Sequence, residues 1–372
     1  MANGFADGPA QALRDYLVAQ GSSVFAVAHP LSPEDGKRHL VREYALGHLV
    51  AEREVRLPLR PPLSFAVDPW IPLLPPRVDA WFGFNPLACM RGLVARVQRR
   101  TPFVALWSVD FVPDRFGPGT PPTRVYDRLD RMCCIRADAR IELSEAARDA
   151  RRRRHHLPAD APAAHVVPMG AWLSRVPTTT PESFRQRRVV YLGHLVPRQG
   201  VAKLIDAIAE LASRGEQIAA DIVGTGPLEA DLREHARKLG LADDVVHFHG
   251  FVADHRDVEV ILSEASIAVA PYRPTDDTFT RYADPGKLKS YLAAGLPIVL
   301  TDVPPNAGEL QREAGAVLVD YDRAALADAL SASLASAELW AERRAAALAY
   351  ARRFDWAELL PGLLRDLALE PG

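Results

Sequence analysis

Residues 218–249 read IAADIVGTGPLEADLREHARKLGLADDVVHFH, and this stretch decides the fold. Ile218–Val223 is a short apolar run that ends in Gly224-Thr225-Gly226-Pro227, the pattern of a strand followed by a turn. Leu228–Leu239 predicts a helix, and Val245–His249 predicts the next strand. A strand, a helix and a strand at this spacing predict a βαβ unit with parallel strands.

The same alternation continues on both sides of this unit. In the second half, strands are predicted at 189–192, 267–270, 298–300 and 317–319, with helices at 201–213, 258–265 and 287–294. The first half alternates similarly with weaker signals, and the irregular stretch 171–188 is the best linker. We therefore predict an α/β protein with two Rossmann-like, doubly wound parallel sheets, one in residues 1–174 and one in 175–354.

Composition narrows the classes of function. The 372 residues carry 45 Lys and Arg against 47 Asp and Glu, a net charge of −2, which argues against a general nucleic-acid binder. Only five of the basic residues are lysines, and Lys287 and Lys289 lie close together. Three cysteines make no disulfide framework, and no His/Cys spacing is typical of a zinc site, so we expect no metal. Without a secretory leader or a long apolar run, we expect a cytoplasmic protein.

Ligands of open parallel sheets bind beyond the carboxyl ends of the strands, so the loops that follow the strands hold the candidate site. In the second half the candidates there are Gly193, His194, Arg198, Gly224, Gly226, Tyr272, Asp284, Gly286, Lys287, Leu288 and Ser290. Lys287 opens a helix, where a cation opposes the helix dipole unless an anion such as a diphosphate binds there. The alternatives are a tight turn at Gly224, a surface arginine at Arg198 and a solvated lysine at Lys287.

Candidates in the first half also follow strands. Asp110 and His29 can act as general base or hold a substrate group, and Asp114 and Arg115 can bind an acceptor or form a local ion pair. The basic run 151–156 is either a solvated helix face or a peripheral contact with anionic lipid. Trp81 and Trp107 could stack on a carbohydrate or pack in the core, and core packing is the better interpretation.

Several blocks of the second half, in order, resemble the donor domain of GT-B glycosyltransferases, especially glycosyltransferase family four (group 1 type). They are VVYLGHLVPRQGVAKLIDAIAEL from 189, DIVGTGPLEADLREHARKLGLADDVVHFHGFV from 221, SIAVAPYRP from 266 and KLKSYLAAGLPIVLTDV from 287. In the first half, ADARIELSEAA from 137 and VVPMGAW from 166 are similar to shorter family segments.

The resemblance implies a fold and a division of roles. Two Rossmann-like domains would face each other across a cleft, with the closing segment 355–372 packed back on the first domain. The second domain would bind a nucleoside-diphosphate sugar and the first a small-molecule, glycan or lipid-linked acceptor. Gly193, His194, Arg198 and Gln199 would line the diphosphate loop. The family needs no metal or other cofactor and commonly retains the sugar's configuration.

This sequence departs from the family at five positions, and at two of them His194 and Gln199 stand where the family commonly has Arg and Lys. Its two signature glutamates would fall at Tyr282 and Ser290, and the histidine that precedes Asp110 in the family is Val109 here. Asp284, Gly286 and Lys287 are the residues available to replace the glutamates. The resemblance therefore predicts sugar transfer to an acceptor hydroxyl, with a nucleotide-sugar epimerase and a catalytically silent partner protein as alternatives.

Overall fold

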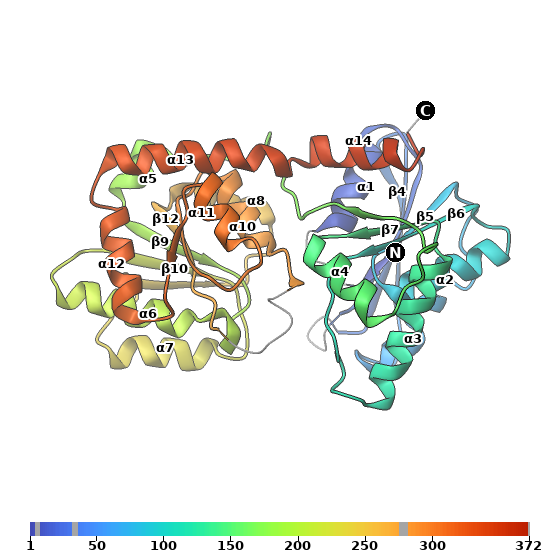
Figure 1. Cartoon of the computed structure of the whole chain (residues 1–372), viewed down its shortest axis with the longest axis horizontal. Helices are drawn as coiled ribbons and strands as arrows, with labels where there is room; N and C mark the ends of the chain where they lie inside the picture. Colours follow the sequence, from blue (N-terminus) through green and yellow to red (C-terminus); the bar gives the residue numbers. More distant parts are fainter. Residues whose placement is uncertain (4–7, 32–35, 275–281, 371–372) are drawn as a thin grey trace. The chain divides into compact units, whose positions relative to one another are not determined.

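The computed structural model describes residues 1–3, 8–31, 36–274 and 282–370, and the chain divides into two compact units (Figure 1). Unit 1 comprises Met1–Met169 and Ala357–Gly372, and unit 2 comprises Gly170–Trp356. The first change of unit lies between Met169 and Gly170, directly before the linker 171–188 and five residues before the boundary at 174 that the sequence suggests. No helix among the described residues is both long and apolar enough to cross a bilayer.

Unit 2 contains a six-stranded sheet in the order β11-β10-β9-β12-β13-β14, with every neighbouring pair parallel. The chain starts in the middle of the sheet, builds outward in one direction and then returns to build in the other, which is the doubly wound order predicted from the sequence. The strands are β9 (Arg188–Leu192), β10 (Ala219–Val223), β11 (Val246–Gly250), β12 (Ile267–Ala270), β13 (Ile298–Thr301) and β14 (Val317–Val319).

Helices cover both faces of this sheet because its strands are apolar on both sides (Figure 1). One apolar core packs α6 (Val201–Ser213), α7 (Glu229–Lys238) and α12 (Arg323–Ser333) on the sheet. The other face carries α5 (Pro181–Arg185), α8 (His255–Glu264), α10 (Gly286–Ala293), α11 (Ala307–Glu313) and α13 (Ala337–Ala351).

Asp221 is the charged residue within the apolar strand β10. Its carboxylate accepts hydrogen bonds from Arg188 Nε at 2.6 Å and from His249 Nε2 at 2.8 Å. These partners lower the pKa of Asp221 to about 2 although burial acts in the opposite direction. The ion pair therefore ties β9, β10 and β11 together.

Unit 1 contains a four-stranded parallel sheet in the order β5-β6-β7-β8, made of β5 (Ala80–Gly83), β6 (Phe103–Ser108), β7 (Ala139–Glu142) and β8 (Ala164–Val166). Three helices accompany it: α2 (Pro86–Val97), α3 (Pro121–Arg136) and α4 (Glu145–Arg154). Trp81 and Trp107 are both buried, so the core interpretation of these two residues is confirmed. The segment 357–372, which includes all but the first residue of α14 (Trp356–Asp366), also belongs to unit 1.

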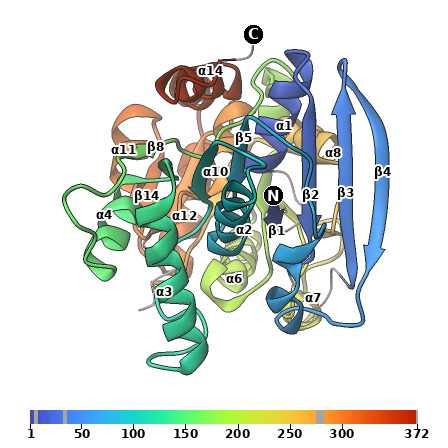
Figure 2. The same cartoon turned by 90° about the vertical axis from the view of Figure 1, so that its right-hand side faces the viewer.

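A second four-stranded sheet of unit 1 is absent from the sequence prediction (Figure 2). It has the order β1-β2-β3-β4, with β1 (Ala2–Asn3) parallel to β2 (Val24–His29), and β3 (Arg38–Ala45) and β4 (His48–Arg56) forming an antiparallel hairpin; α1 (Pro9–Ala19) precedes β2. Nearly every residue of β4 is exposed, so the strand shows no alternation. Its turn uses Leu46 and Gly47 at φ 50° and 80°, and Leu is not a turn signal. Within residues 1–174, the predicted parallel sheet is therefore formed by β5–β8, which follow one another in chain order.

Candidate functional site

The order of strands in unit 2 locates the candidate site at the carboxyl ends of β9 and β12. These two strands are paired in the middle of the sheet, and the chain proceeds from them in opposite directions. Loops that leave neighbouring strands in opposite directions open a crevice between them, where ligands of doubly wound sheets bind. The loop after β9 begins at Gly193, and the loop after β12 begins at Pro271.

The loops after β9 and β10 pack together backbone to backbone. Gly193 and Gly224 have φ values of 140° and 130°, which L side chains rarely adopt. A Cβ on Gly224 would lie 2.1 Å from the carbonyl oxygen of Gly193, and one on Gly226 would lie 2.5 Å from that of Leu195. The glycines therefore serve close approach between two chain segments, so the tight-turn interpretation of Gly224 describes this backbone well.

Lys287 brings a cation to the crevice from the first turn of α10. Its Nζ lies 4.3 Å from the ring centre of Tyr191 at the end of β9 and 5.0 Å from that of Tyr272 just after β12. The ammonium donates a hydrogen bond to Gln199 Oε1 at 2.5 Å. A Cβ on Gly193 would lie 3.0 Å from the same Nζ. The lysine, the β9 loop and the β12 loop thus meet at one point.

The electrostatics of Lys287 are unfavourable in the free protein. Burial, and then the positive charge of Arg198, lower its pKa to about 7. Among the described residues no carboxylate lies within ion-pair distance of its Nζ. The amide groups at the start of α10 add further positive potential, since Pro285 precedes the helix without a side-chain cap. An anion here would relieve the conflict, and the solvated-lysine alternative does not describe this environment.

Asp284 and Lys289 neutralise each other beside this point. Lys289 Nζ lies 2.8 Å from Asp284 Oδ1, and both side chains are buried. The Lys289 ammonium also lies 3.9 Å from the ring centre of Phe354. Of the two lysines of α10, Lys287 is therefore the one without a carboxylate partner in the described part of the chain, and the predicted catalytic Asp284 is engaged in an ion pair.

The remaining predicted donor residues lie around the crevice in different ways. His194 is exposed and contributes its backbone carbonyl, which accepts a hydrogen bond from Tyr191 Oη at 3.1 Å. The carbonyl of Arg198 accepts one from the amide of Arg273 at 2.9 Å, which joins the β9 and β12 loops. Leu288 is fully buried in the core, and Ser290 Oγ turns back to the carbonyl of Gly286 at 3.4 Å.

The hydroxyl of Tyr272 is a further polar group beside Lys287. This hydroxyl is buried and has no hydrogen-bond partner among the described residues. Buried hydroxyls are normally paired, so this one is available to a ligand. Residues 275–281 of the loop that precedes α10 lie outside the described part of the chain, whereas Tyr282, at one of the expected glutamate positions, lies inside it.

In unit 1 the predicted residues after β6 are held in ion pairs. Asp110 Oδ1 lies 2.6 Å from a guanidinium nitrogen of Arg115, and Asp114 Oδ1 lies 2.8 Å from one of Arg154. Asp114 has a φ of 54°, so the loop turns sharply there. The local ion-pair alternative is correct in kind, but the partners are Asp110 with Arg115 rather than Asp114 with Arg115.

A buried network behind Asp110 was missed in the sequence. Arg151 in α4 is fully buried, pairs with the carboxylates of Asp130 and Glu142, and donates to Ser108 Oγ and to the carbonyl of Asp110. Both interpretations of the run 151–156 treated it as one exposed face, and that is wrong for Arg151. The signal was Glu142 in the short strand 139–142, because a buried carboxylate needs a cation. The network fixes the backbone from which Asp110 projects.

His29, the other predicted catalytic residue of unit 1, is 1% exposed. Its Nδ1 lies 2.9 Å from Nδ1 of His39, a residue that the sequence analysis did not single out. His29 is thus part of a buried cluster rather than an open strand end.

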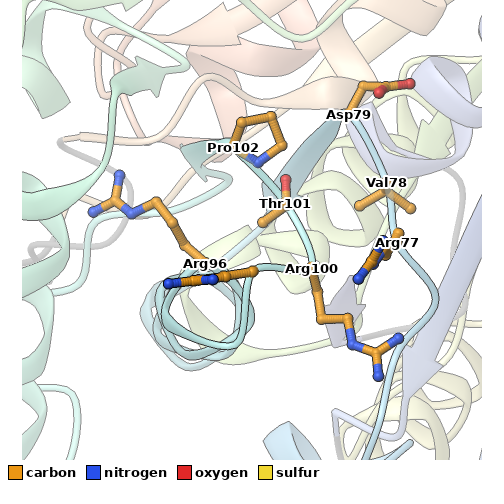
Figure 3. Close-up of a pocket in the computed structure, with 8 residues that line it drawn as sticks. Arg77, Val78, Asp79, Arg96, Arg100, Thr101 and Pro102 are labelled. Carbon is orange, nitrogen blue, oxygen red and sulfur yellow. The ribbon is translucent and has the colours of Figure 1, made fainter.

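A cavity of about 490 Å³ in unit 1 is lined by arginines and lies away from these residues (Figure 3). Asp79 and Pro102, which line it, directly precede β5 and β6. It therefore opens at the amino ends of the parallel strands, whereas Asp110 follows the carboxyl end of β6. Arg96 on its wall already pairs with Asp138 at 2.9 Å.

The comparisons with known proteins agree with this geometry. Residues 186–336 match the model of the family described as "Glycosyl transferases group 1". An alpha-D-kanosaminyltransferase of Streptomyces kanamyceticus is 27% identical over 168 residues, 41% of this chain and 43% of that protein. A phosphatidyl-myo-inositol mannosyltransferase of Mycobacterium leprae is 30% identical over 192 residues, 48% of this chain and 46% of that protein. The matched stretches thus span less than half the length of these relatives.

Solved structures share the fold over more of the chain. The structure of Anabaena Alr3699/HepE in complex with UDP has a TM-score of 0.63 at 18% identity and covers 78% of each chain. That of WaaG, a glycosyltransferase involved in lipopolysaccharide biosynthesis, has a TM-score of 0.60 at 16% identity and covers 98% of this chain and 97% of its own. The predicted GT-B fold class and the resemblance to group 1 glycosyltransferases are confirmed.

Proposed function

Because residues 186–336 form a glycosyl transferases group 1 domain within a GT-B fold, we propose that the chain transfers a sugar from a nucleoside-diphosphate sugar to an acceptor hydroxyl. The observation that carries the proposal is the Lys287 ammonium, placed without a carboxylate partner among the described residues where β9 and β12 diverge. Two relatives are named as sugar transferases and one fold neighbour was solved in complex with UDP, which supports the same substrate class.

In the proposed reaction the leaving diphosphate binds at the crevice of unit 2. Negative charge builds up on the diphosphate as the bond to the sugar breaks, and groups aimed at that charge lower the barrier. Lys287, Arg198 and the first amides of α10 would supply the positive potential, and Tyr272 Oη a hydrogen bond. These cations can balance the diphosphate without a metal, and we propose a metal-independent transfer with retention of configuration.

The acceptor would be read by unit 1. Asp110 carries a carboxylate on a loop fixed by Arg151, and Arg115 and Asp114 are charged groups on the same loop. A hydroxyl of a small molecule, a glycan or a lipid-linked sugar matches a carboxylate that accepts its proton. For a lipid-linked acceptor, we also propose that the protein contacts the membrane surface peripherally.

Calorimetric titration of the full chain with UDP, GDP, dTDP and ADP tests the donor site. We expect at least one nucleotide to bind, and Lys287→Met to weaken that binding by more than about tenfold through loss of a charge-assisted hydrogen bond. Lys238→Met, at an exposed lysine at the end of α7, is the matched control and should leave the affinity unchanged. Failure of all four nucleotides to bind would disprove the proposal.

Turnover separates the alternatives. Incubation of the matching nucleotide sugar with cell-extract acceptors should give a glycosylated product that depends on the acceptor. Conversion of the donor without any acceptor would instead identify an epimerase, and binding without turnover would identify a catalytically silent partner.

A further inference from the structure

Three side chains that commonly bind metals meet inside unit 1. His29 is the last residue of β2, His39 lies in β3, and Asp68 begins the 3-10 helix Asp68–Trp70. In the antiparallel pairing of β2 and β3, Ala28 lies opposite Leu40, which places the two histidines next along the same register. Their exposed fractions are 1%, 0% and 1%, so water and substrates reach none of them in this conformation.

The ligand atoms are spaced as a small tetrahedral cation requires. The two Nδ1 atoms are 2.9 Å apart, His39 Nδ1 is 3.7 Å from Asp68 Oδ1, and all three atoms lie within 4.8 Å of one another. Zinc binds imidazole nitrogen and carboxylate oxygen at about 2.0–2.2 Å, so tetrahedral ligands lie roughly 3.3–3.5 Å apart. The observed separations fall on either side of that value, and side-chain rotations of a few tenths of an ångström reach it.

Hydrogen bonding alone satisfies this cluster poorly. A hydrogen bond between the two Nδ1 atoms uses one proton and leaves Nε2 of both rings to find partners. Neither Nε2 has one among the described residues, although both atoms are buried. Nearly all buried polar side-chain atoms have a hydrogen-bond partner. An ion held by the two Nδ1 atoms would replace the contact between them and fix each Nε2 as the N–H of its ring, without giving it a partner.

The surroundings of Asp68 are arranged for coordination. Ser64 Oγ donates to Asp68 Oδ2 at 3.3 Å, which leaves Oδ1 directed to the histidines. A hydrogen bond to the other carboxylate oxygen is the usual way in which proteins orient a ligating carboxylate. The carboxylate also supplies negative charge to a cation that is cut off from water.

We propose that His29 Nδ1, His39 Nδ1 and Asp68 Oδ1 bind one zinc ion, with a fourth position for water. Two imidazoles and one carboxylate suit zinc and its transition-metal neighbours rather than magnesium or calcium, which prefer oxygen ligands. The ion joins the end of β2 to the proline-rich stretch 58–76, in which the described elements are two short 3-10 helices. The site is independent of glycosyl transfer, and it departs from the sequence expectation that the protein holds no metal.

Metal analysis of the purified full chain, after growth with zinc and dialysis, tests the site directly. We expect about one zinc ion per chain, and near-complete loss of that zinc in both His39→Gln and Asp68→Asn. His48→Gln, at an exposed histidine of the β3–β4 hairpin, is the matched control and should keep the wild-type zinc content. Equal zinc content in all four proteins would place the ion elsewhere and overturn the proposal, as would wild-type protein without zinc.

Two further readouts keep the test independent of folding defects. Asp68→Asn preserves shape, and circular dichroism with and without EDTA reports whether it folds. In wild-type protein, zinc should raise the melting temperature while magnesium and calcium at the same concentration do not, because a ligand of the native state stabilises it. Cobalt in place of zinc should give the visible absorption of a tetrahedral site, absent from a folded Asp68→Asn variant. A melting temperature that does not respond to zinc, or cobalt spectra identical in the two proteins, would refute the site.

Discussion

Replacing Lys287 by Met should make unit 2 more stable and its donor binding weaker. The pKa of Lys287 falls from 10.5 to about 7, chiefly through burial. At about 1.36 kcal/mol for each pKa step of one, keeping this ammonium out of water costs at most about 5 kcal/mol. Solvent reaches part of the side chain, so we discount the cost to about 2 kcal/mol. Met fills the same space without the charge.

Little else is lost on this replacement. Gln199 Oε1, which accepts the hydrogen bond from Lys287, also accepts one from Tyr191 Oη at 3.3 Å and so remains paired. We therefore expect the melting temperature to rise by about 5 °C at pH 6.5, since about 1 kcal/mol corresponds to roughly 2–4 °C in a unit of this size. Affinity for the nucleoside diphosphate should fall by about 10–100-fold.

The direction of the pKa shift of Lys287 determines how the stability of the protein changes with pH. Because the folded-state pKa is lowered, the unfolded chain binds more protons between about pH 7 and 10.5, and wild-type stability from this group rises over that range. The stability gain of Lys287→Met is thus largest below pH 7 and vanishes near pH 10.5. Donor affinity should weaken about fivefold from pH 7 to 8 in wild type relative to the variant, as the ammonium loses its proton.

Calorimetry and thermal unfolding at pH 6.5 and 8.5 measure both quantities, with Lys289→Met for comparison. Lys289 is also a lysine of α10, but its replacement removes the ammonium that balances the buried Asp284 carboxylate, so this variant should lose stability instead of gaining it. If Lys287→Met melts lower than wild type, or binds nucleotide equally well, the assignment of Lys287 to an anion site is refuted.

Three other substitutions, two of them with a control variant, test interactions inside each unit by urea unfolding. Gly224→Ala should lower the free energy of unfolding by at least about 3 kcal/mol, because its Cβ would lie 2.1 Å from a carbonyl oxygen. Gly240 also has a positive φ but open space around it, so Gly240→Ala should cost about 1 kcal/mol. Equal costs for the two variants would contradict the close approach at Gly224. Arg151→Met should cost about 3–5 kcal/mol by removing the buried cation shared by the Asp130 and Glu142 carboxylates, of which Asp130 keeps His155 as a partner. Exposed Arg152→Met should cost less than about 0.5 kcal/mol, and a mild Arg151 variant would rule out the buried network. Because its pKa is lowered to about 2, Asp221 should stabilise the folded protein by about 2 kcal/mol above pH 5, and this contribution should be lost as the pH falls toward 2. Asp221→Asn should therefore flatten the dependence of the unfolding free energy on pH in this range. An unchanged dependence would argue against the ion pair.

The fold of unit 2 could be predicted from the sequence because most of its strands are short apolar runs that are followed by a helix with one apolar side. The hairpin β3–β4 could not, since an exposed edge strand has no core to impose alternation and the Leu46-Gly47 turn lacks a turn signal.

The candidate site, like the fold, could be predicted from the sequence only in part. Sequence position identified Lys287 and the glycines, because dipole and backbone arguments are local. It could not show that Lys289 is neutralised, since only the folded chain brings Asp284 to that lysine. The His29–His39 pair likewise depends on a strand register that no local pattern encodes.

The division of the chain also affects the order in which the protein can fold during synthesis. Unit 2 is one continuous segment, Gly170–Trp356, whereas unit 1 needs the distant residues 357–372. There α14 contributes the fully buried side chains of Leu360, Leu363 and Leu364. On the ribosome, the first 169 residues must therefore wait, with an apolar surface uncovered, until unit 2 has been translated and the last helix emerges. The segment made first is completed last, so nascent unit 1 is the part of this protein most exposed to chaperones and proteases.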